Sequence, residues 1–266
     1  MPFKIITSLS NPQVKSVVAL RERKARESSG LTIVEGVREI SAAVAAKVPV
    51  KELYVCREFF TNRGEEELIR MIPLPGWVEV PKAVFEKISY GDRQEGVLAV
   101  CAPRVHQLKD LKLRNAPLVV VLESVEKPGN LGAVLRSCDG AGVDALFLCG
   151  QGADVYNPNV IRASTGTVFH IPVVVSDNET FSGYLKKLKI RAIAAVVQAK
   201  TVYTQADFKG GAAIVLGSEQ NGLSDFWIKN SQAQVKIPML GKADSLNVST
   251  TAALLIYEAL RQRGIK

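Results

Sequence analysis

The pattern of hydrophobic and polar residues alternates along the chain between short apolar runs and segments with helical spacing. The run PLVVVLESV at 117–125 is apolar at consecutive positions, which is typical of a strand buried on both faces of a parallel sheet. Residues 130–142 and 245–263 instead carry apolar residues three and four positions apart, which predicts amphipathic helices. Repeated strand–helix alternation of this kind predicts an α/β fold, with a parallel sheet flanked by helices.

The first hundred residues predict a smaller α/β unit of their own. One helix is expected over 11–26, capped at Asn11 and with Pro12 at its first position. Further helical segments separate four expected strands, which lie at 31–36, 51–56, 77–80 and 96–102. Four strands with helices between them are enough for a compact unit.

The length and composition are compatible with two domains. The chain has 266 residues, of which 47% are hydrophobic and 23% charged, as in globular proteins. Residues 105–116 are polar and basic and follow a proline, which is typical of a linker. We therefore expect one domain over 1–104 and a second over 117–266.

Several functional classes lack their sequence signals. No apolar run approaches the roughly 20 residues that a bilayer span requires. The start, MPFKIITSLSNPQVKS, has neither the long apolar core nor the cleavage site of a signal peptide, so we expect a cytoplasmic protein. The four cysteines show no CxxC spacing and the chain has two histidines, which argues against a metal site and favours free, buried thiols. So few histidines also disfavour a histidine-dependent triad.

The charge favours a polyanionic partner. The formal net charge is +8, and residues 1–30 hold six lysines and arginines against two glutamates. Within the segment RERKAR at 21–26, we expect Arg21, Lys24 and Arg26 to contact nucleic-acid phosphate. A solvated helix face is the alternative interpretation of the same cluster.

Three segments at expected strand ends carry the candidate chemistry, because ligands of open α/β sheets bind beyond the carboxyl ends of the strands. These segments, at 123–136, 216–224 and 237–249, are rich in Gly, Asn, Ser or Pro. The motifs GxGxxG and GxxxxGK[ST] are absent, which argues against a dinucleotide-dependent dehydrogenase and a P-loop NTPase. Taken singly, the polar residues of these segments are explained as helix caps or exposed side chains.

Taken together, three motifs resemble a known family. PGNLGAVLR at 128–136, GSEQNG at 217–222 and IPMLGKADSLNVSTTAALLIYEA at 237–259 resemble, in order and spacing, the motifs of SpoU/TrmH-type RNA 2′-O-ribose methyltransferases of the SPOUT superfamily. The N-terminal part, with LTIVEGVREI at 31–40, is similar to the substrate-binding domain of many members, which resembles ribosomal protein L30e.

This resemblance implies a fold, a cofactor and an assembly. The parallel sheet is expected to end in a deep trefoil knot, and the chain is expected to form homodimers through this knotted domain. S-adenosyl-L-methionine is expected to bind in the knot, held largely by backbone groups. The resemblance places the main cofactor contacts at Gly217, Ile237 and Leu246. It places further contacts at Leu216, Met239 and Asn247.

The resemblance also implies catalytic roles. Arg136 is expected to contact the phosphate of the target nucleotide and to assist deprotonation of the 2′-hydroxyl. Since arginine stays protonated, its chemistry favours orienting the ribose phosphate over accepting a proton. Asn130 and Ser245 would position Arg136 or the nucleotide, whereas Asn247 and Glu219 would shape the pocket and orient cofactor or ribose.

Two further cations are expected to bind RNA. Arg162, in IRASTG, matches a position at which family members often carry an arginine. Lys127 departs from the family pattern, because many members have an aspartate before this proline. The substitution adds positive charge beside the expected RNA groove.

The sequence thus predicts an S-adenosylmethionine-dependent enzyme that methylates a ribose 2′-hydroxyl of RNA, with 23S ribosomal RNA favoured over transfer RNA. A transfer RNA methyltransferase is the alternative within the same chemistry. A catalytically silent RNA-binding or ribosome-assembly factor is the alternative from another class.

Overall fold

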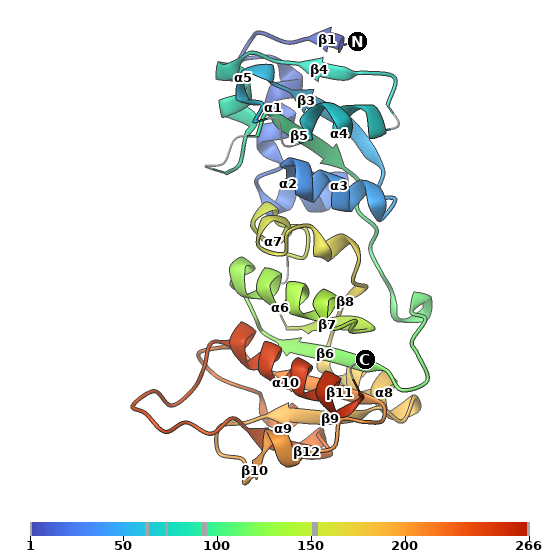
Figure 1. Ribbon diagram of the computed structural model, residues 1–266, viewed down its shortest axis with the longest axis vertical. Coiled ribbons are helices and arrows are strands. Elements are labelled where there is room, and N and C mark those ends of the chain that lie inside the picture. The colour runs from blue at the N-terminus through green and yellow to red at the C-terminus, as the bar shows by residue number, and fades with distance from the viewer. Residues whose placement is uncertain (1, 62–63, 73, 92–94, 151–153, 265–266) are drawn as a thin grey trace. The chain divides into compact units, whose positions relative to one another are not determined.

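The computed structural model describes residues 2–61, 64–72, 74–91, 95–150 and 154–264. The chain divides into two compact units (Figure 1). The first comprises residues 1–104 and 156–170, and the second comprises 105–155 and 171–266.

The first unit is built on a five-stranded sheet in the order β1-β4-β3-β5-β2. Its strands are β1 (Pro2–Ile5), β2 (Thr32–Glu35), β3 (Val50–Val55), β4 (Trp77–Glu79) and β5 (Val97–Cys101). β1, β4 and β3 are parallel, whereas β5 is antiparallel to both β3 and β2. The sequence predicted four of these strands and missed β1, which lies at the edge of the sheet.

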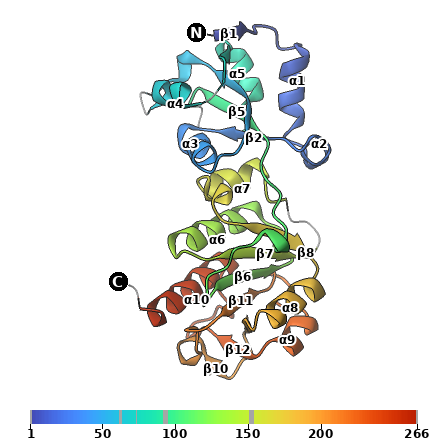
Figure 2. The ribbon, with the colours of Figure 1, turned by 90° about the vertical axis from the view of Figure 1, so that its right-hand side faces the viewer.

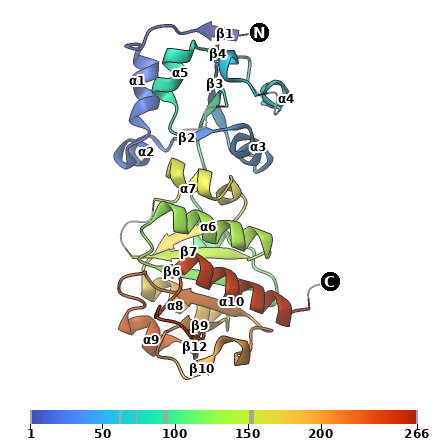
Figure 3. The ribbon, with the colours of Figure 1, turned by 60° about the vertical axis from the view of Figure 1, so that its left-hand side comes forward.

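Helices cover both faces of this sheet. They are α1 (Pro12–Ala19), α2 (Arg23–Ser29), α3 (Val37–Ala45), α4 (Glu65–Met71), α5 (Lys82–Ile88) and α7 (Pro158–Ala163). Figure 3 shows α1 and α5 on one face and α3 and α4 on the other. Fully buried Tyr54, Phe85 and Leu98 belong to the core beneath α1 and α5.

The single helix expected over 11–26 is two helices. Asn11 caps α1 as predicted, since its Oδ1 accepts a hydrogen bond from the backbone N–H of Gln13 at 2.8 Å. α1 ends before Leu20, and α2 starts at Arg23 after an extended Glu22. The break is held by Arg26, whose Nη1 donates to the carbonyl oxygens of Leu20 at 2.7 Å and Arg21 at 2.6 Å.

The segment 156–170 packs with the first unit, although the sequence assigned it to the domain over 117–266. Thr32 Oγ1 donates to the carbonyl oxygen of Tyr156 at 2.7 Å, and Asn159 Nδ2 donates to the Tyr90 hydroxyl at 3.0 Å. These contacts join residues that are far apart in the sequence, so no local pattern signals them.

The second unit contains the parallel sheet that the sequence predicts. Seven strands lie in the order β10-β12-β9-β11-β6-β7-β8, and every pairing is parallel. They are β6 (Leu118–Glu123), β7 (Ala145–Cys149), β8 (Val173–Ser176), β9 (Arg191–Ala195), β10 (Thr201–Val202), β11 (Ala212–Leu216) and β12 (Ala233–Lys236). All residues of β6, β7 and β11 are buried, as expected for strands covered on both faces.

Two pairs of helices flank this sheet. The helices are α6 (Pro128–Gly140), α8 (Asn178–Lys187), α9 (Asp225–Asn230) and α10 (Val248–Gln262). Figure 2 shows α6 and α10 on one side of the sheet and α8 and α9 on the other. The helix-flanked parallel sheet is confirmed, whereas the knotted threading of its C-terminal segment stays a prediction.

Two further expectations concern the whole chain. All four cysteines are free and buried, as predicted, and burial raises the pKa of the Cys101 and Cys149 thiols to about 12. None of the helices in the described ranges has the length and apolar character that a membrane span requires.

Asp144 fixes the amino end of the central strand β6. Its side chain is 5% exposed and accepts hydrogen bonds from the backbone N–H of Leu118 at 2.8 Å and from Arg114 Nε at 2.8 Å. Burial alone would raise the pKa of this carboxyl, but the hydrogen bonds from Arg114 and Leu118 outweigh burial and lower it.

We predict that Asp144→Asn lowers the free energy of unfolding by about 1–3 kcal/mol at neutral pH, because an amide replaces one accepting oxygen. A lowered folded-state pKa stabilises the protein above the unfolded-state value of about 3.9. This stabilisation is lost as pH falls through the folded-state pKa. Urea unfolding of both proteins between pH 7 and pH 3 should therefore show a constant difference above about pH 5 and a shrinking one below about pH 4. A difference unchanged at pH 3 would contradict this.

Candidate active site

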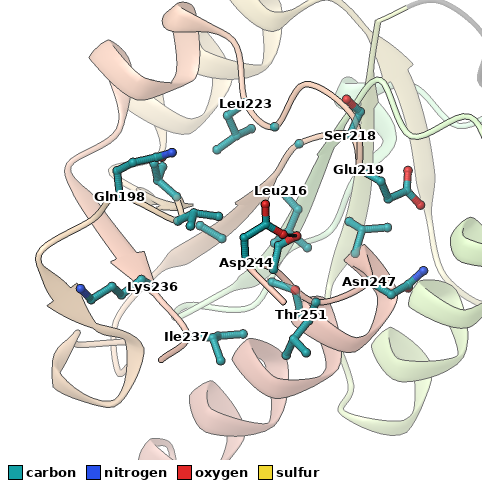
Figure 4. Close-up of a pocket in the computed structure, with 18 of the residues that line it drawn as sticks. Gln198, Leu216, Ser218, Glu219, Leu223, Lys236, Ile237, Asp244, Asn247 and Thr251 are labelled. Atoms are coloured by element: carbon teal, nitrogen blue, oxygen red, sulfur yellow. Dashed lines mark hydrogen bonds between the residues drawn. The ribbon is translucent and has the colours of Figure 1, made fainter. Parts of the chain in front are cut away.

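A cavity of about 570 Å³ opens in the second unit beyond the carboxyl ends of β9, β11 and β12 (Figure 4). This size is typical of small-molecule sites, which range from roughly 300 to 1,000 Å³. Its walls include residues 195–198 at the end of β9, residues 216–223 at the end of β11, and residues 235–237, 239 and 244–248, which lead from β12 into α10. Parallel pairing brings these segments to one edge of the sheet.

All six residues predicted to contact the cofactor line this cavity. They are Leu216, Gly217, Ile237, Met239, Leu246 and Asn247. The cavity also has several polar side chains, namely Gln198, Ser218, Glu219, Lys236, Asp244, Ser245, Asn247 and Thr251. A mixed apolar and polar lining of this kind can hold a nucleoside-like ligand and orient its polar groups.

Two of these lining residues were not predicted from the sequence. Gln198 and Lys236 were not singled out, although Lys236 ends β12 and Gln198 follows β9 by three residues. The rule that ligands bind beyond the carboxyl ends of parallel strands applies to both positions. It could have identified them once the strand boundaries were known.

Gly217 lies where the backbone of the loop 217–224 folds back on itself. A Cβ at this position would lie 2.1 Å from the carbonyl carbon and oxygen of Gly222 and 2.4 Å from Leu223 N. The fold-back is closed by Gly222 N, which donates to the Ser218 carbonyl oxygen at 3.0 Å. Only glycine leaves room for this close approach of two backbone segments.

Asn130, Glu219 and Asn247 form one hydrogen-bonded group. Asn130 Nδ2 donates to the Glu219 carboxylate, and Asn247 Nδ2 donates to Asn130 Oδ1 at 3.2 Å. The three residues come from α6, the loop 217–224 and the start of α10. The structure therefore joins the three predicted motifs through their polar side chains.

Asn130 and Asn247 differ as capping residues. The cap position of α6 is Lys127, so Asn130 lies inside the first turn. Its side chain forms hydrogen bonds with Glu219 and Asn247 of the other two motifs. Asn247 does cap its helix, since its Oδ1 accepts from Ser249 N at 2.9 Å and from Ser249 Oγ at 2.6 Å. Its amide nitrogen remains for Asn130.

Ser245 and Arg136 are both exposed. Ser245 lines the cavity and its hydroxyl donates to Asp244 Oδ1 at 3.2 Å. Arg136 lies on α6 but is not among the residues that line the cavity. Its side chain makes no hydrogen bond or ion pair with any other residue of the described ranges, so its guanidinium is available to an anion.

The basic cluster at 21–26 is not one exposed face, which corrects the sequence-based expectation. Lys24 is exposed, but Arg21 is half-buried and its Nη2 donates to the carbonyl oxygens of Lys87, at 2.7 Å, and of Ser89. Arg26 is 6% exposed and binds the carbonyls that end α1. Nη2 of Arg21 and Nη1 of Arg26 are thus bound to backbone carbonyls, so of the three cations of this cluster expected to contact RNA only Lys24 is exposed.

Of the other two cations expected to bind RNA, Lys127 is exposed at the start of α6, whereas Arg162 is half-buried in the first unit. Arg162 lines a cavity of about 400 Å³ within that unit, together with the carboxylates of Glu35, Glu39 and Glu95. Burial, reinforced by the charge of Glu95, raises the pKa of the Glu39 carboxyl. The surroundings of Arg162 are therefore acidic.

Family models match both parts of the chain. The model of the SpoU rRNA Methylase family matches residues 117–257, and that of the MRM3-like substrate binding domain matches residues 11–99. Across the described ranges, no group of three or more histidine, cysteine, aspartate or glutamate side chains is placed to hold a metal ion.

Similar proteins are known over nearly the whole length. The chain is 28% identical to the 23S rRNA (guanosine(2553)-2′-O)-methyltransferase RlmP of Bacillus subtilis, over 96% of this chain and 98% of that protein. A solved RNA 2′-O ribose methyltransferase is 39% identical, with a TM-score of 0.87 over 97% of this chain and 99% of that one. The SpoU methyltransferase AviRb of Streptomyces viridochromogenes, solved with the cofactor AdoMet, is 30% identical, with a TM-score of 0.86 over 95% and 99% of the two chains.

The family model spans more than half of the chain. Two of the three motifs line one cavity, and the first motif joins them through the hydrogen bonds of Asn130. On these grounds the chain belongs to the SpoU rRNA Methylase family.

Proposed function

We propose that this protein is an S-adenosylmethionine-dependent methyltransferase that modifies a ribose 2′-hydroxyl of 23S ribosomal RNA. The observation that carries the proposal is the arrangement of the cavity. Its walls contain the six expected cofactor-contacting residues, and Asn130, Glu219 and Asn247 join its three motifs. Family membership and the activity named for the Bacillus subtilis relative support the reaction and the RNA.

The residues of the cavity fit the cofactor. Leu216, Ile237 and Leu246 supply apolar surface, and Gly217 brings its backbone close to the bound molecule without a side chain between them. When bound, S-adenosylmethionine supplies the methyl group on a positively charged sulfur. Met239 and Asn247 contact the cofactor as well.

The remaining residues act on the nucleotide. A ribose 2′-hydroxyl is a weak nucleophile at neutral pH, so it must be held in line with the methyl group and must lose its proton. Arg136, free of partners among the described residues, binds the target phosphate and orients the ribose. Arginine carries a permanent positive charge in proteins, so the role assigned to Arg136 is to stabilise negative charge, and the proton of the 2′-hydroxyl passes to water.

The polar group around Asn130 holds this arrangement in place. Asn130 and Ser245 position the nucleotide against Arg136, and Glu219 and Asn247 orient ribose and cofactor. The shared hydrogen bonds of Asn130 and the position of Ser245 on the cavity wall support these roles, which the family resemblance implies.

RNA binding extends beyond the cavity. The proposal assigns phosphate contacts to Lys24 and Lys127, which are exposed, and retains Arg162 from the sequence motif. The domain over 1–104 selects the RNA, residues 105–116 link it to the rest, and the domain over 117–266 carries the knot and the reaction. We place the protein in the cytoplasm, where ribosomal RNA is found.

We also propose a homodimer through the knotted domain. On α10, Leu254 is 37% exposed and Tyr257 is 48% exposed, and both project from the helix that packs beside α6. Exposed apolar side chains on neighbouring turns of one helix are suited to a protein interface. A second copy of the chain is the partner that the resemblance implies.

The function is tested by methyl transfer from labelled S-adenosylmethionine to total RNA from a strain that lacks this gene. We expect label in 23S ribosomal RNA at a linkage that resists alkali, as a 2′-O-methyl group requires. Label in transfer RNA would favour the alternative substrate. If calorimetry detects no cofactor binding and no RNA is labelled, the protein is a silent RNA-binding factor instead.

We predict that Arg136→Ala lowers kcat by roughly 100-fold or more, because the ribose loses its orienting contact. The Kd for S-adenosylmethionine should stay within about twofold, since Arg136 does not line the cavity. Lys127→Ala, which removes an exposed cation from the start of the same helix, is the matched control and should weaken RNA binding with little change in kcat. Wild-type turnover by Arg136→Ala would refute its assigned role.

We predict that Gly217→Ala weakens S-adenosylmethionine binding by about tenfold or more, because its Cβ forces the loop 217–224 away from its fold-back. Isothermal titration calorimetry measures this change. Gly183→Ala is the control, since a Cβ at Gly183, in α8, meets no atom within 4 Å. It should leave cofactor affinity unchanged, and equal affinities of the two variants would contradict the prediction.

A further inference from the structure

Glu123 is a buried carboxylate to which the mechanism above assigns no role. It is the last residue of β6 and is 5% exposed. Its Oε1 accepts from Asn178 Nδ2 at 2.6 Å and from Ser224 Oγ at 2.7 Å, and its Oε2 accepts from Ser224 N at 2.7 Å. A buried carboxylate is costly unless its oxygens are hydrogen-bonded, and here neutral donors satisfy both of them.

These donors connect four segments of the second unit. Asn178 is the first residue of α8, and its Oδ1 accepts from Trp227 Nε1, in α9, at 2.9 Å. Ser224 ends the loop 217–224 and occupies the cap position of α9, where its side chain makes no capping bond. Its hydroxyl and its N–H both donate hydrogen bonds to Glu123 instead.

The loop that Glu123 holds is a wall of the cavity. The start of this loop follows β11 and is fixed by the close contact of Gly217 with Gly222. Its end is fixed at Ser224 by Glu123. Between these two anchors, Glu219 binds Asn130 in α6, and α6 begins five residues after Glu123.

We propose that Glu123 is a positioning residue for the reaction. It holds the loop 217–224 at a fixed place relative to α6, so that Glu219 meets Asn130 and Gly217 faces the cofactor. This proposal rests on the proposed function, because it assigns the loop to cofactor binding. Glu123 itself acts through Ser224 and does not touch the reacting atoms.

Asp144 provides a matched control, because it binds a backbone N–H at the amino end of β6, whereas Glu123 binds one from the carboxyl end. Each carboxylate is largely buried and accepts a hydrogen bond from a backbone N–H. Glu123 ends β6, and Asp144 immediately precedes the neighbouring strand β7. Asp144 binds Leu118 and Arg114, and neither of these lines the cavity. Loss of either carboxylate should destabilise the fold, whereas only loss of Glu123 should release the loop.

Trp227 supplies a spectroscopic readout of the same network. The chain has two tryptophans, Trp77 and Trp227, so Trp77→Phe leaves the indole of Trp227 as the single source of tryptophan fluorescence. This indole is joined to Glu123 through Asn178. We expect its emission to change when S-adenosylmethionine binds, because contacts of the cofactor with the loop reach Trp227 through Ser224, Glu123 and Asn178.

The test introduces Glu123→Gln, Ser224→Ala and Asp144→Asn separately into the full chain carrying Trp77→Phe. In Glu123→Gln an amide donor faces the donors of Ser224 and Asn178, so we expect the Kd for S-adenosylmethionine to rise about tenfold and kcat to fall by a similar factor. The emission change of Trp227 should be lost. Asp144→Asn should lower Tm but keep cofactor affinity within about twofold and retain the emission change.

Ser224→Ala keeps the proposal testable if Glu123→Gln does not fold, since it removes one of the three hydrogen bonds and retains the backbone one. It should weaken cofactor binding by a smaller factor, in the same direction. Unchanged affinity in the folded Glu123→Gln or Ser224→Ala protein would overturn the proposal, as would an equal loss of affinity in Asp144→Asn. A parent protein that neither binds S-adenosylmethionine nor methylates RNA would instead contradict the proposed function.

Discussion

The parallel pairing of β6 with β11 is the constraint on which the site depends. Leu122 pairs with Leu216 in register, so the two strands end at the same level of the sheet. The chain leaves β6 toward α6 and leaves β11 into the loop 217–224 from neighbouring points. Asn130 and Glu219, 89 residues apart in sequence, can therefore share a hydrogen bond. A slip of one residue in this register would exchange the side chains that one strand presents to the two helix layers and would shift the two motifs relative to each other.

The same constraint explains what the sequence could and could not predict. Continuous apolar runs identified the buried parallel strands, because that signal is local. The residues that the family resemblance assigns to the cofactor all line one cavity, although their contacts with it stay a prediction. The partner of Asn130 was not predictable, since a cap and a bridge between motifs use the same residue type. The break between α1 and α2 was missed for a similar reason. Arg26 counts as a surface charge in any pattern, but here it binds the carbonyls of Leu20 and Arg21.

The start of α10 shows how one residue can meet two requirements. A helix N-terminus needs acceptors for its free N–H groups, and Asn247 provides one through its Oδ1. The other half of the same amide donates to Asn130. Ser249 supplies both its backbone N–H and its hydroxyl to Asn247, which fixes the orientation of the amide. The cluster of small polar residues at this helix therefore serves the cavity wall as well as the cap.

Some arginines of the chain bind backbone carbonyls and stabilise the fold, whereas others are available to a ligand. The net charge of +8 does not tell the two kinds apart. Arg263 donates to the carbonyl oxygens of Phe208, Gly210, Ala116 and Pro117, so it holds together the segments that lead into β6 and β11 at the end of α10. Arg21 and Arg26 do the same for α1, α2 and α5. An arginine that satisfies backbone carbonyls cannot leave them for a phosphate without leaving acceptors unpaired. Arg136 has no such partner within the described ranges, although it lies on a well-packed helix. Because it satisfies no backbone carbonyl of these ranges, its guanidinium can bind an anion without leaving acceptors unpaired, as the proposed contact with the substrate phosphate requires.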